Sequence, residues 1–538
     1  MKKLHPVILS VSSGLLLAAA WPPLPTTLLI FLAFIPLFFL LEKGLSRFRF
    51  LGWVYISMII WNSITTWWMW NSTGPGSVAA IVVNSLFMCL PWLAFYNAHK
   101  RLGPKYSYWT FIACWMTFEY IHLNWELSWP WLTLGNVFAT RPEWVQWYQF
   151  TGTSGGSLWV LVINVLLFKK VLSASSNRKL LKRSLPLFLI ATIGIPLAFS
   201  YMVRAYNMQL DAAAKGSKTL NNIVVVQPNI DPYQKFETGT QEAQLSTLIR
   251  LSEAGIDSNT ALVVWPETAI NLPNGIEEDS IRKNYLVNPV WGFLKKHPHV
   301  KLLSGVEGYR MYRGGEHTVY SRQIPNTDIW YDAFNTAAML DSTGIIMRYH
   351  KSKLVPGVEM LPSFLRFMGP WFEQFGGTTG GYARQDERTV LKDPSNSYAI
   401  APAVCYESIY GEFMTGFIRR GANIICIITN DGWWGNTSGH KQHLSYARLR
   451  AIESRRWVVR SANTGISAFI DPYGEILQPQ PWATEAVIKQ AVPVRDHLTF
   501  YVRFGDIISK IMIALAIILL GYSTFVMATT IRRKKTAI

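Results

Sequence analysis

The chain has 538 residues, of which 50% are hydrophobic, and its mean hydropathy is +0.16. This apolar content exceeds what one soluble core needs, so part of it is expected to face lipid. The 23 Trp are consistent with a membrane protein, because Trp is enriched where a membrane meets water. Four Cys are too few for a disulfide scaffold, and the formal charge of +18 forms no single basic stripe, which argues against a nucleic-acid-binding protein.

Eight apolar stretches are long enough, or nearly so, to cross about 30 Å of hydrocarbon. Seven precede a long mixed segment and one follows it, at 6–20, 24–41, 50–69, 77–96, 106–122, 155–172, 185–203 and 507–530. We therefore predict a transmembrane domain of seven helices over 1–203, a large domain over 204–506, and a C-terminal transmembrane helix with a basic cytoplasmic tail over 507–538. The first stretch also fits a cleaved signal peptide, and both readings stay open.

Basic residues occupy alternate connections between the apolar stretches. They precede the first stretch and follow the second, fourth, sixth and eighth, at Lys2, Lys3, Lys43, Arg47, Arg49, Lys100, Arg101, Lys105, Lys169, Lys170, Arg178, Lys179, Lys182, Arg183 and 532–535. Because Lys and Arg are retained on the cytoplasmic side, both termini are expected in the cytoplasm. The large domain is then expected on the outer face, and a cleaved first stretch would not change this.

The large domain has the pattern of a layered α/β fold. Short β-branched runs at 223–227, 261–265, 300–304 and 423–429 alternate with helix-like stretches at 238–254, 278–296 and 438–455. Nearly continuous apolar runs of this length are typical of strands buried on both faces. Chemistry in such sheets tends to lie at strand ends. Three reactive side chains follow predicted strands, namely Glu267, Lys351 and Cys405.

These three residue types together form a nucleophilic set. A thiol with a pKa of about 8.5 is mostly protonated at neutral pH, so it needs a base or a cation to react as a thiolate. Glu267 can take the proton, and Lys351 can stabilise the oxyanion that forms when the thiolate attacks a carbonyl. Each residue alone is more often structural, since a lone Cys at a strand end is usually a small buried hydrophobe.

The residues around these three positions resemble the nitrilase superfamily of carbon-nitrogen hydrolases. The matching stretches occur in the family's order, as Trp265-Pro-Glu-Thr268, Tyr349-His-Lys-Ser-Lys-Leu-Val-Pro356 and Cys405-Tyr-Glu407. The resemblance implies an αββα sandwich and a Glu-Lys-Cys triad, with Glu267, Lys351 and Cys405 at the matching positions.

The layout of the whole chain resembles the apolipoprotein N-acyltransferase family, a membrane branch of that superfamily. Further matching stretches are 226–229, 429–435, 442–443, 447–453, 460–466 and 471–474. The resemblance implies a phospholipid acyl donor, a thioester on Cys405, and transfer to the α-amine of a diacylglyceryl-modified cysteine at the N-terminus of an apolipoprotein. It also implies a bacterial inner membrane location with the catalytic domain facing the periplasm. We expect a monomer in contact with membrane lipids, with no cofactor, no metal and no nucleic acid.

Four further residues match family site residues by the same resemblance. Glu359 stands where the family has a second acid, Tyr406 and Glu407 follow the nucleophile, and Phe236 lies near a position where the family often has Trp. An alternative role for both acids is structural ion pairing. The sequence departs from the family at 357–358, usually Phe-Gly, and it places Lys353 where His is common.

Two other functions compete with the acyltransferase. A membrane-tethered amide or nitrile hydrolase would use the same triad with water as acceptor, but it would need one anchor at most. A transporter or receptor with an inactive outer domain would predict ionisable residues deep in the spans or broken helix pairs. The Gly-rich segment 364–388 suggests either a lid or a plain surface insertion.

Overall fold

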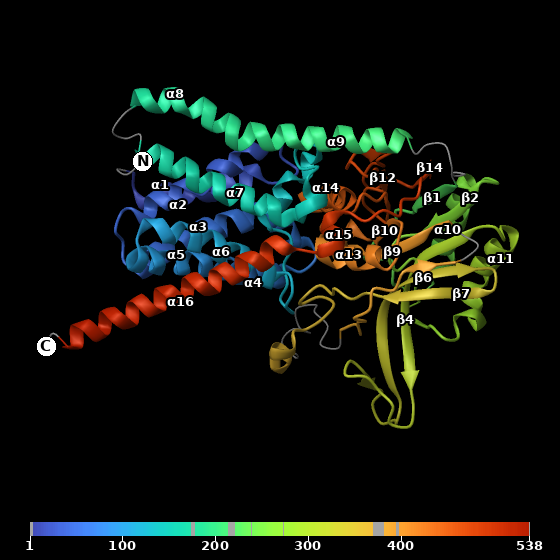
Figure 1. The fold of residues 1–538 in the computed structure, drawn as a ribbon. Coiled ribbons are helices and arrows are strands. Elements are labelled where there is room, and N and C mark those ends of the chain that lie inside the picture. The colour runs from blue at the N-terminus through green and yellow to red at the C-terminus, as the bar shows by residue number, and fades with distance from the viewer. Residues whose placement is uncertain are drawn as a thin grey trace. The chain divides into compact units, whose positions relative to one another are not determined.

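The computed structural model describes residues 4–173, 178–213, 221–237, 239–272, 274–368, 381–393 and 397–536 (Figure 1). The chain divides into two compact units. One consists of Met1–Trp70, Gly74–Tyr206 and Phe504–Ile538, and the other of Asn71–Thr73 and Asn207–Arg503. Residues 369–380, in the middle of the suggested lid at 364–388, lie outside the described residues.

The first unit is helical. Its main helices are α1 (Pro6–Ala20), α2 (Ile35–Leu41), α3 (Arg47–Thr66), α4 (Gly74–Phe87), α5 (Cys89–Leu102), α6 (Pro104–His122), α7 (Tyr148–Ser173), α8 (Arg178–Leu189), α16 (Ile507–Thr536) and the part of α9 (Ile195–Ala213) up to Tyr206. Within the described residues, four stretches are long and apolar enough to cross a membrane, at Gly74–Leu102, Tyr148–Leu172, Ser184–Ala213 and Ile507–Arg533. The protein is therefore a multi-pass α-helical membrane protein.

The other predicted spans are also helical but weaker as membrane segments. α3 and α6 have 20 and 19 residues and are less apolar than those four stretches. Pro6–Ala20 and Thr27–Leu41 are apolar but shorter. The last span before the large domain continues to Ala213, ten residues beyond its predicted end at 203.

The second unit contains two β-sheets. The first sheet has the order β14 (Ala486–Ala491), β1 (Asn222–Gln227), β2 (Thr260–Val264), β4 (Lys301–Tyr312), β6 (Trp330–Asp341), β5 (Arg322–Gln323), with β3 (Ile276–Glu277) paired to β4 and β7 (Gly344–His350) to β6. The second has the order β13 (Ile476–Leu477), β12 (Ala468–Ile470), β11 (Val458–Ala462), β10 (Ile424–Thr429), β9 (Ala399–Val404), β8 (Leu391–Lys392).

The two sheets pack against each other between helices. β1 contacts β11 and β6 contacts β9. Helices α10 (Gln241–Gly255) and α11 (Asn288–Lys296) share one apolar core with the first sheet, whereas α13 (Gly411–Arg419) and α14 (Ser438–Ser454) pack on the second. This arrangement confirms the predicted αββα sandwich (Figure 1).

One predicted helix of this unit is shorter than expected. The stretch 278–296 becomes helical only at α11, because two 3₁₀ turns occupy Ile281–Lys283 and Tyr285–Val287. Asn284 caps the second turn by accepting from the Leu286 amide at 3.1 Å. The helix then begins with a proline in its first turn, where the missing N–H costs no hydrogen bond.

Candidate active site

Strand direction brings the three predicted site residues to one end of the sandwich. In the first sheet β2 is parallel to β4, and β7 runs the same way because both β4 and β7 are antiparallel to β6. Glu267 follows β2 and Lys351 follows β7, so both lie at the carboxyl ends of strands that point alike. Cys405 follows β9 of the second sheet and interacts electrostatically with both of them.

The Glu267 carboxylate is held by three donors. Its Oε1 accepts from Asn335 Nδ2 at 2.7 Å and from Lys351 Nζ at 3.3 Å. Its Oε2 accepts from the Asn430 amide at 3.1 Å. Because hydrogen bonds to a charged group are among the stronger ones, this contact set fixes the orientation of the carboxylate.

Lys351 bridges two carboxylates in the interior. Its side chain is 1% exposed and its ammonium lies 2.6 Å from Glu359 Oε1 as well as 3.3 Å from Glu267 Oε1. Burial alone would lower the pKa of Lys351, but the carboxylates of Glu359 and Glu267 raise it above its ordinary value. The lysine is therefore a permanent cation, suited to stabilising a negative charge that develops beside it.

Cys405 begins a tight turn directly after β9. Its φ is 53°, in the left-handed region that a residue with a side chain rarely adopts, and the surrounding fold must hold it there. The residue is 8% exposed. Burial raises the pKa of the Cys405 thiol, and the Glu267 carboxylate raises it further, against an opposing effect of Lys351. The resting group is therefore a thiol, which needs a base before it can act as a nucleophile.

Glu407 ties together two loops of the site. Its Oε1 accepts from the Tyr349 hydroxyl at 2.6 Å and from the amides of Ser352 at 2.7 Å and Lys353 at 3.0 Å. Its Oε2 accepts from the amide of Val404 at 3.0 Å. Burial raises the pKa of this carboxyl, which has no exposed surface. Glu407 therefore positions the residues beside the thiol and the lysine.

A second buried network supports the Cys405 backbone. His443 Nδ1 lies 3.0 Å from Asp431 Oδ1, and Arg460 Nη2 donates to Asp431 Oδ2 at 2.6 Å. Although burial raises it, Arg460 and His443 hold the pKa of Asp431 below its ordinary range. His443 Nε2 lies 3.2 Å from the Cys405 carbonyl oxygen, to which the Ser408 hydroxyl donates at 2.8 Å. These contacts give Asp431 and His443 a structural role beneath the nucleophile.

The two aromatic candidates lie in different surroundings. Tyr406 is buried and its ring meets that of Tyr410 edge-on at 5.3 Å. Phe236 is 38% exposed, as an apolar side chain that contacts a substrate would be. The structure thus places Tyr406 in the packing around the nucleophile.

Sequence reasoning missed a lysine beside the candidate base. Lys235, the residue before Phe236, is 1% exposed and donates to the Glu267 carbonyl oxygen at 2.7 Å and to Thr268 Oγ1 at 2.8 Å. Burial lowers the pKa of Lys235 to about 8. It thereby fixes the turn after β2, where Thr268 has a φ of 48°. No local signal in the sequence marked it, since a single Lys in a loop is usually solvated.

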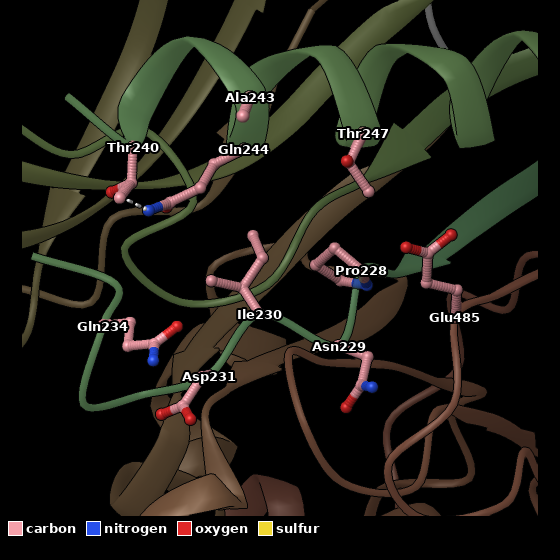
Figure 2. A pocket seen from close by; sticks show the side chains of 10 residues that line it. All are labelled: Pro228, Asn229, Ile230, Asp231, Gln234, Thr240, Ala243, Gln244, Thr247 and Glu485. Carbon is pink, nitrogen blue, oxygen red and sulfur yellow. Dashed lines mark hydrogen bonds between the residues drawn. The ribbon is translucent and has the colours of Figure 1, made fainter. Parts of the chain in front are cut away.

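A nearby pocket does not coincide with this chemistry. Figure 2 shows it between the segment after β1, the first turns of α10 and one glutamate. Its lining residues are Pro228, Asn229, Ile230, Asp231, Gln234, Thr240, Ala243, Gln244, Thr247 and Glu485. They include none of the triad candidates, so the site is defined by its contacts and not by this cavity.

Comparison with known proteins agrees with both units. Residues 13–166 match the family model of the apolipoprotein N-acyltransferase N-terminal domain, and residues 315–496 match that of carbon-nitrogen hydrolase. An apolipoprotein N-acyltransferase of Chlorobaculum tepidum is 30% identical over 531 residues, which cover 95% of each chain. Another, of Geobacter metallireducens, is 27% identical over 94% of this chain and 93% of its own.

Solved structures of the nitrilase superfamily resemble part of the chain. Nit3 of Saccharomyces cerevisiae is 19% identical, covers 52% of this chain and 93% of its own, and has a TM-score of 0.35. A mutant amidase from Nesterenkonia covers 53% of this chain and 94% of its own at 16% identity, with a TM-score of 0.34. Similarities this weak carry no argument, and the sheet topology and family matches are the stronger evidence.

Proposed function

The chain belongs to the apolipoprotein N-acyltransferase family and is an acyltransferase, and from this premise we propose the reaction, the substrates and the residues that act on them. The acyl donor is a phospholipid and the acceptor is the α-amine of a diacylglyceryl-modified cysteine at the amino terminus of an apolipoprotein. Cys405 is the nucleophile, Glu267 the general base and acid, and Lys351 the oxyanion-stabilising cation.

The first half-reaction acylates the thiol. Glu267 takes the proton of Cys405 while Sγ attacks the ester carbonyl of the phospholipid, and the Lys351 ammonium stabilises the tetrahedral oxyanion. As the intermediate collapses, the lysophospholipid oxygen leaves and receives the proton from Glu267. The acyl chain remains as a thioester on Cys405, and all atoms and charges balance.

The second half-reaction transfers the acyl chain to nitrogen. The neutral α-amine attacks the thioester carbonyl, Glu267 takes the proton that the nitrogen loses, and the departing sulfur receives it. The products are an amide and the free thiol, so the kinetics are ping-pong. The same carboxylate serves both halves because it is ionised again after each.

The observation that carries this proposal is the buried position of Lys351 between two carboxylates beside the thiol. Its Nζ lies 2.6 Å from Glu359 and 3.3 Å from Glu267. Glu359 also accepts from the Val355 amide at 2.8 Å, so it anchors the loop and orients the lysine. We assign Glu359 and Glu407 as positioning residues, Tyr406 as packing support, and Phe236 to contact with an acyl chain.

The family and the apolar helices indicate an inner-membrane protein, and we further propose its orientation and its monomeric state. Both termini are cytoplasmic and the catalytic unit is periplasmic, an orientation that the basic connections support. A green fluorescent protein fused to the C-terminus should fluoresce, and alkaline phosphatase inserted at the exposed Gly314 should be active. An inactive phosphatase in a folded chain would mean that the proposed orientation is wrong.

The decisive experiment is the intact mass of the purified protein after incubation with phospholipid alone. A gain of one acyl chain is expected in the wild type and in Cys426→Ala, which alters another buried free cysteine in β10. Cys405→Ala should gain nothing. Adding a diacylglyceryl-cysteine peptide should remove the acyl chain from the enzyme and place it on the peptide.

The competing hydrolase is distinguished by the same experiment. If phospholipid is cleaved and the peptide gains nothing, water is the acceptor and the hydrolase reading replaces the transferase. If the wild-type protein gains no acyl chain and the phospholipid stays intact, the assignment of the donor is wrong.

A further inference from the structure

The second half-reaction releases one more proton than the triad can absorb. An α-amine ordinarily has a pKa of about 8, so it is mostly an ammonium at neutral pH. Conversion of this ammonium into an amide removes two protons, of which only one is used, to restore the Cys405 thiol through Glu267. Another acceptor must take the first proton before the nitrogen can attack.

Glu307 is a carboxylate that none of the steps above uses, and it belongs to the same wall of the site. It lies on β4 directly opposite Asn335 of β6, the residue that donates to Glu267. Its Oε1 accepts from the Tyr382 hydroxyl at 2.8 Å. The Tyr382 amide in turn donates to the Glu359 carbonyl oxygen at 2.9 Å, which links Glu307 to the loop beside the lysine.

The second oxygen of Glu307 gives this carboxyl a high affinity for a proton. Its Oε2 is buried and has no hydrogen-bond partner within the part of the chain that the structure describes. Burial of an incompletely paired carboxylate disfavours its ionised form. Burial therefore raises the pKa of Glu307 to about 7, with the Tyr382 hydroxyl and the Lys235 ammonium opposing the shift and the Glu267 and Glu359 carboxylates adding to it.

The charges of the cluster also fit a cationic substrate. Three carboxylates, Glu267, Glu307 and Glu359, surround two ammonium groups, Lys235 and Lys351. When all five are ionised the cluster carries one net negative charge. The positive charge of an arriving ammonium balances this negative charge. When the ammonium transfers its proton to Glu307, both charges are neutralised.

We propose that Glu307 accepts the first proton of the acceptor ammonium, relayed by the Tyr382 hydroxyl, in the proposed N-acyl transfer. The Tyr382 oxygen takes a proton from the nitrogen as its own hydroxyl proton passes to Glu307 Oε1. The amine is then neutral and attacks the thioester, while Glu267 takes the second proton. Glu307 returns its proton to water after the amide leaves. The inference rests on the proposed function and adds a step specific to the second half-reaction.

The test separates the two half-reactions in full-length protein. Wild type, Glu307→Gln and Tyr382→Phe are first acylated by phospholipid to completion, as followed by intact mass, so that transfer is measured from the acyl-enzyme and does not depend on the acylation rate of each variant. Diacylglyceryl-cysteine peptide is then added. Without Glu307 the amine must lose its proton to bulk water, and only about one tenth of it is neutral at pH 7. Transfer should therefore be slower than in wild type at pH 7, by up to about tenfold, and within about twofold of wild type at pH 9.

Hydroxylamine provides the matched control nucleophile, because it is largely uncharged at pH 7 and has no ammonium proton to lose. It should deacylate the wild type and both variants at equal rates. Equal slowing with hydroxylamine and peptide, or variants that transfer to peptide as fast as wild type, would overturn the proposal. So would variants that fail to acylate beside an active wild type. A wild type that never acylates would instead refute the proposed function, and this inference with it.

Discussion

Replacement of Lys235 by Met should change how stability depends on pH. Burial lowers the pKa of Lys235 to about 8, whereas a lysine in the unfolded chain titrates near 10.4. Between these values the folded protein binds fewer protons than the unfolded one, so its stability rises with pH. Linkage predicts that the free energy of unfolding of the wild type increases by about 2 kcal/mol, relative to that of Lys235→Met, between pH 7.5 and pH 10.

The assay is chemical denaturation of the full-length protein in detergent at several pH values, with Lys301→Met as control. Lys301 lies 3.2 Å from Asp341 and 2.7 Å from Asp393, and these carboxylates raise its pKa against the opposing effect of burial. Its stabilising effect should therefore stay constant up to about pH 10. A wild-type advantage over Lys235→Met that does not grow with pH would refute the reasoning.

Three other substitutions test the contacts around the thiol. Asn335→Ala removes the 2.7 Å hydrogen bond to the candidate base, and loss of a bond to a charged group, about 1.5–3 kcal/mol, should slow acylation by about ten- to a hundredfold in single-turnover mass measurements. Glu359→Gln removes the carboxylate 2.6 Å from Lys351 and should slow acylation by a similar factor, whereas unchanged acylation would exclude a positioning role. Tyr349→Phe removes the 2.6 Å bond to Glu407 and should lower the free energy of unfolding by about 1–3 kcal/mol, measured by denaturant titration; an unchanged midpoint would contradict it.

Residues with a strong local pattern were predictable from the sequence. The apolar stretches identified the helices, and the β-branched runs identified β1, β2 and β10 close to their observed bounds, whereas the run at 300–304 marked only the start of β4. Periodicity and length carry this information because burial on a helix or strand depends on neighbours along the chain. The run at 261–265 ends two residues before Glu267, and Cys405 follows the apolar stretch 401–404, which is why both could be named as candidates.

The weaker features needed tertiary structure. The helix expected at 278–296 begins only at Asn288, because turns and a proline break a stretch whose composition alone looks helical. The eight expected spans are all helical. Among the described residues, four stretches are apolar and long enough by themselves to cross a membrane. The less apolar helices α3 and α6 pack on α1 and α5, and composition does not report such packing.

By itself the sequence determined the class of protein, the two kinds of fold unit and the three residues proposed for catalysis. Only the tertiary structure decided how those residues are held. Asn335 meets Glu267 because β6 pairs with β4 in one register, and Lys235 reaches Glu267 across 32 positions of chain. Glu307 faces Asn335 through that same register. Such contacts depend on which strands lie side by side, and no local pattern of residues records that pairing.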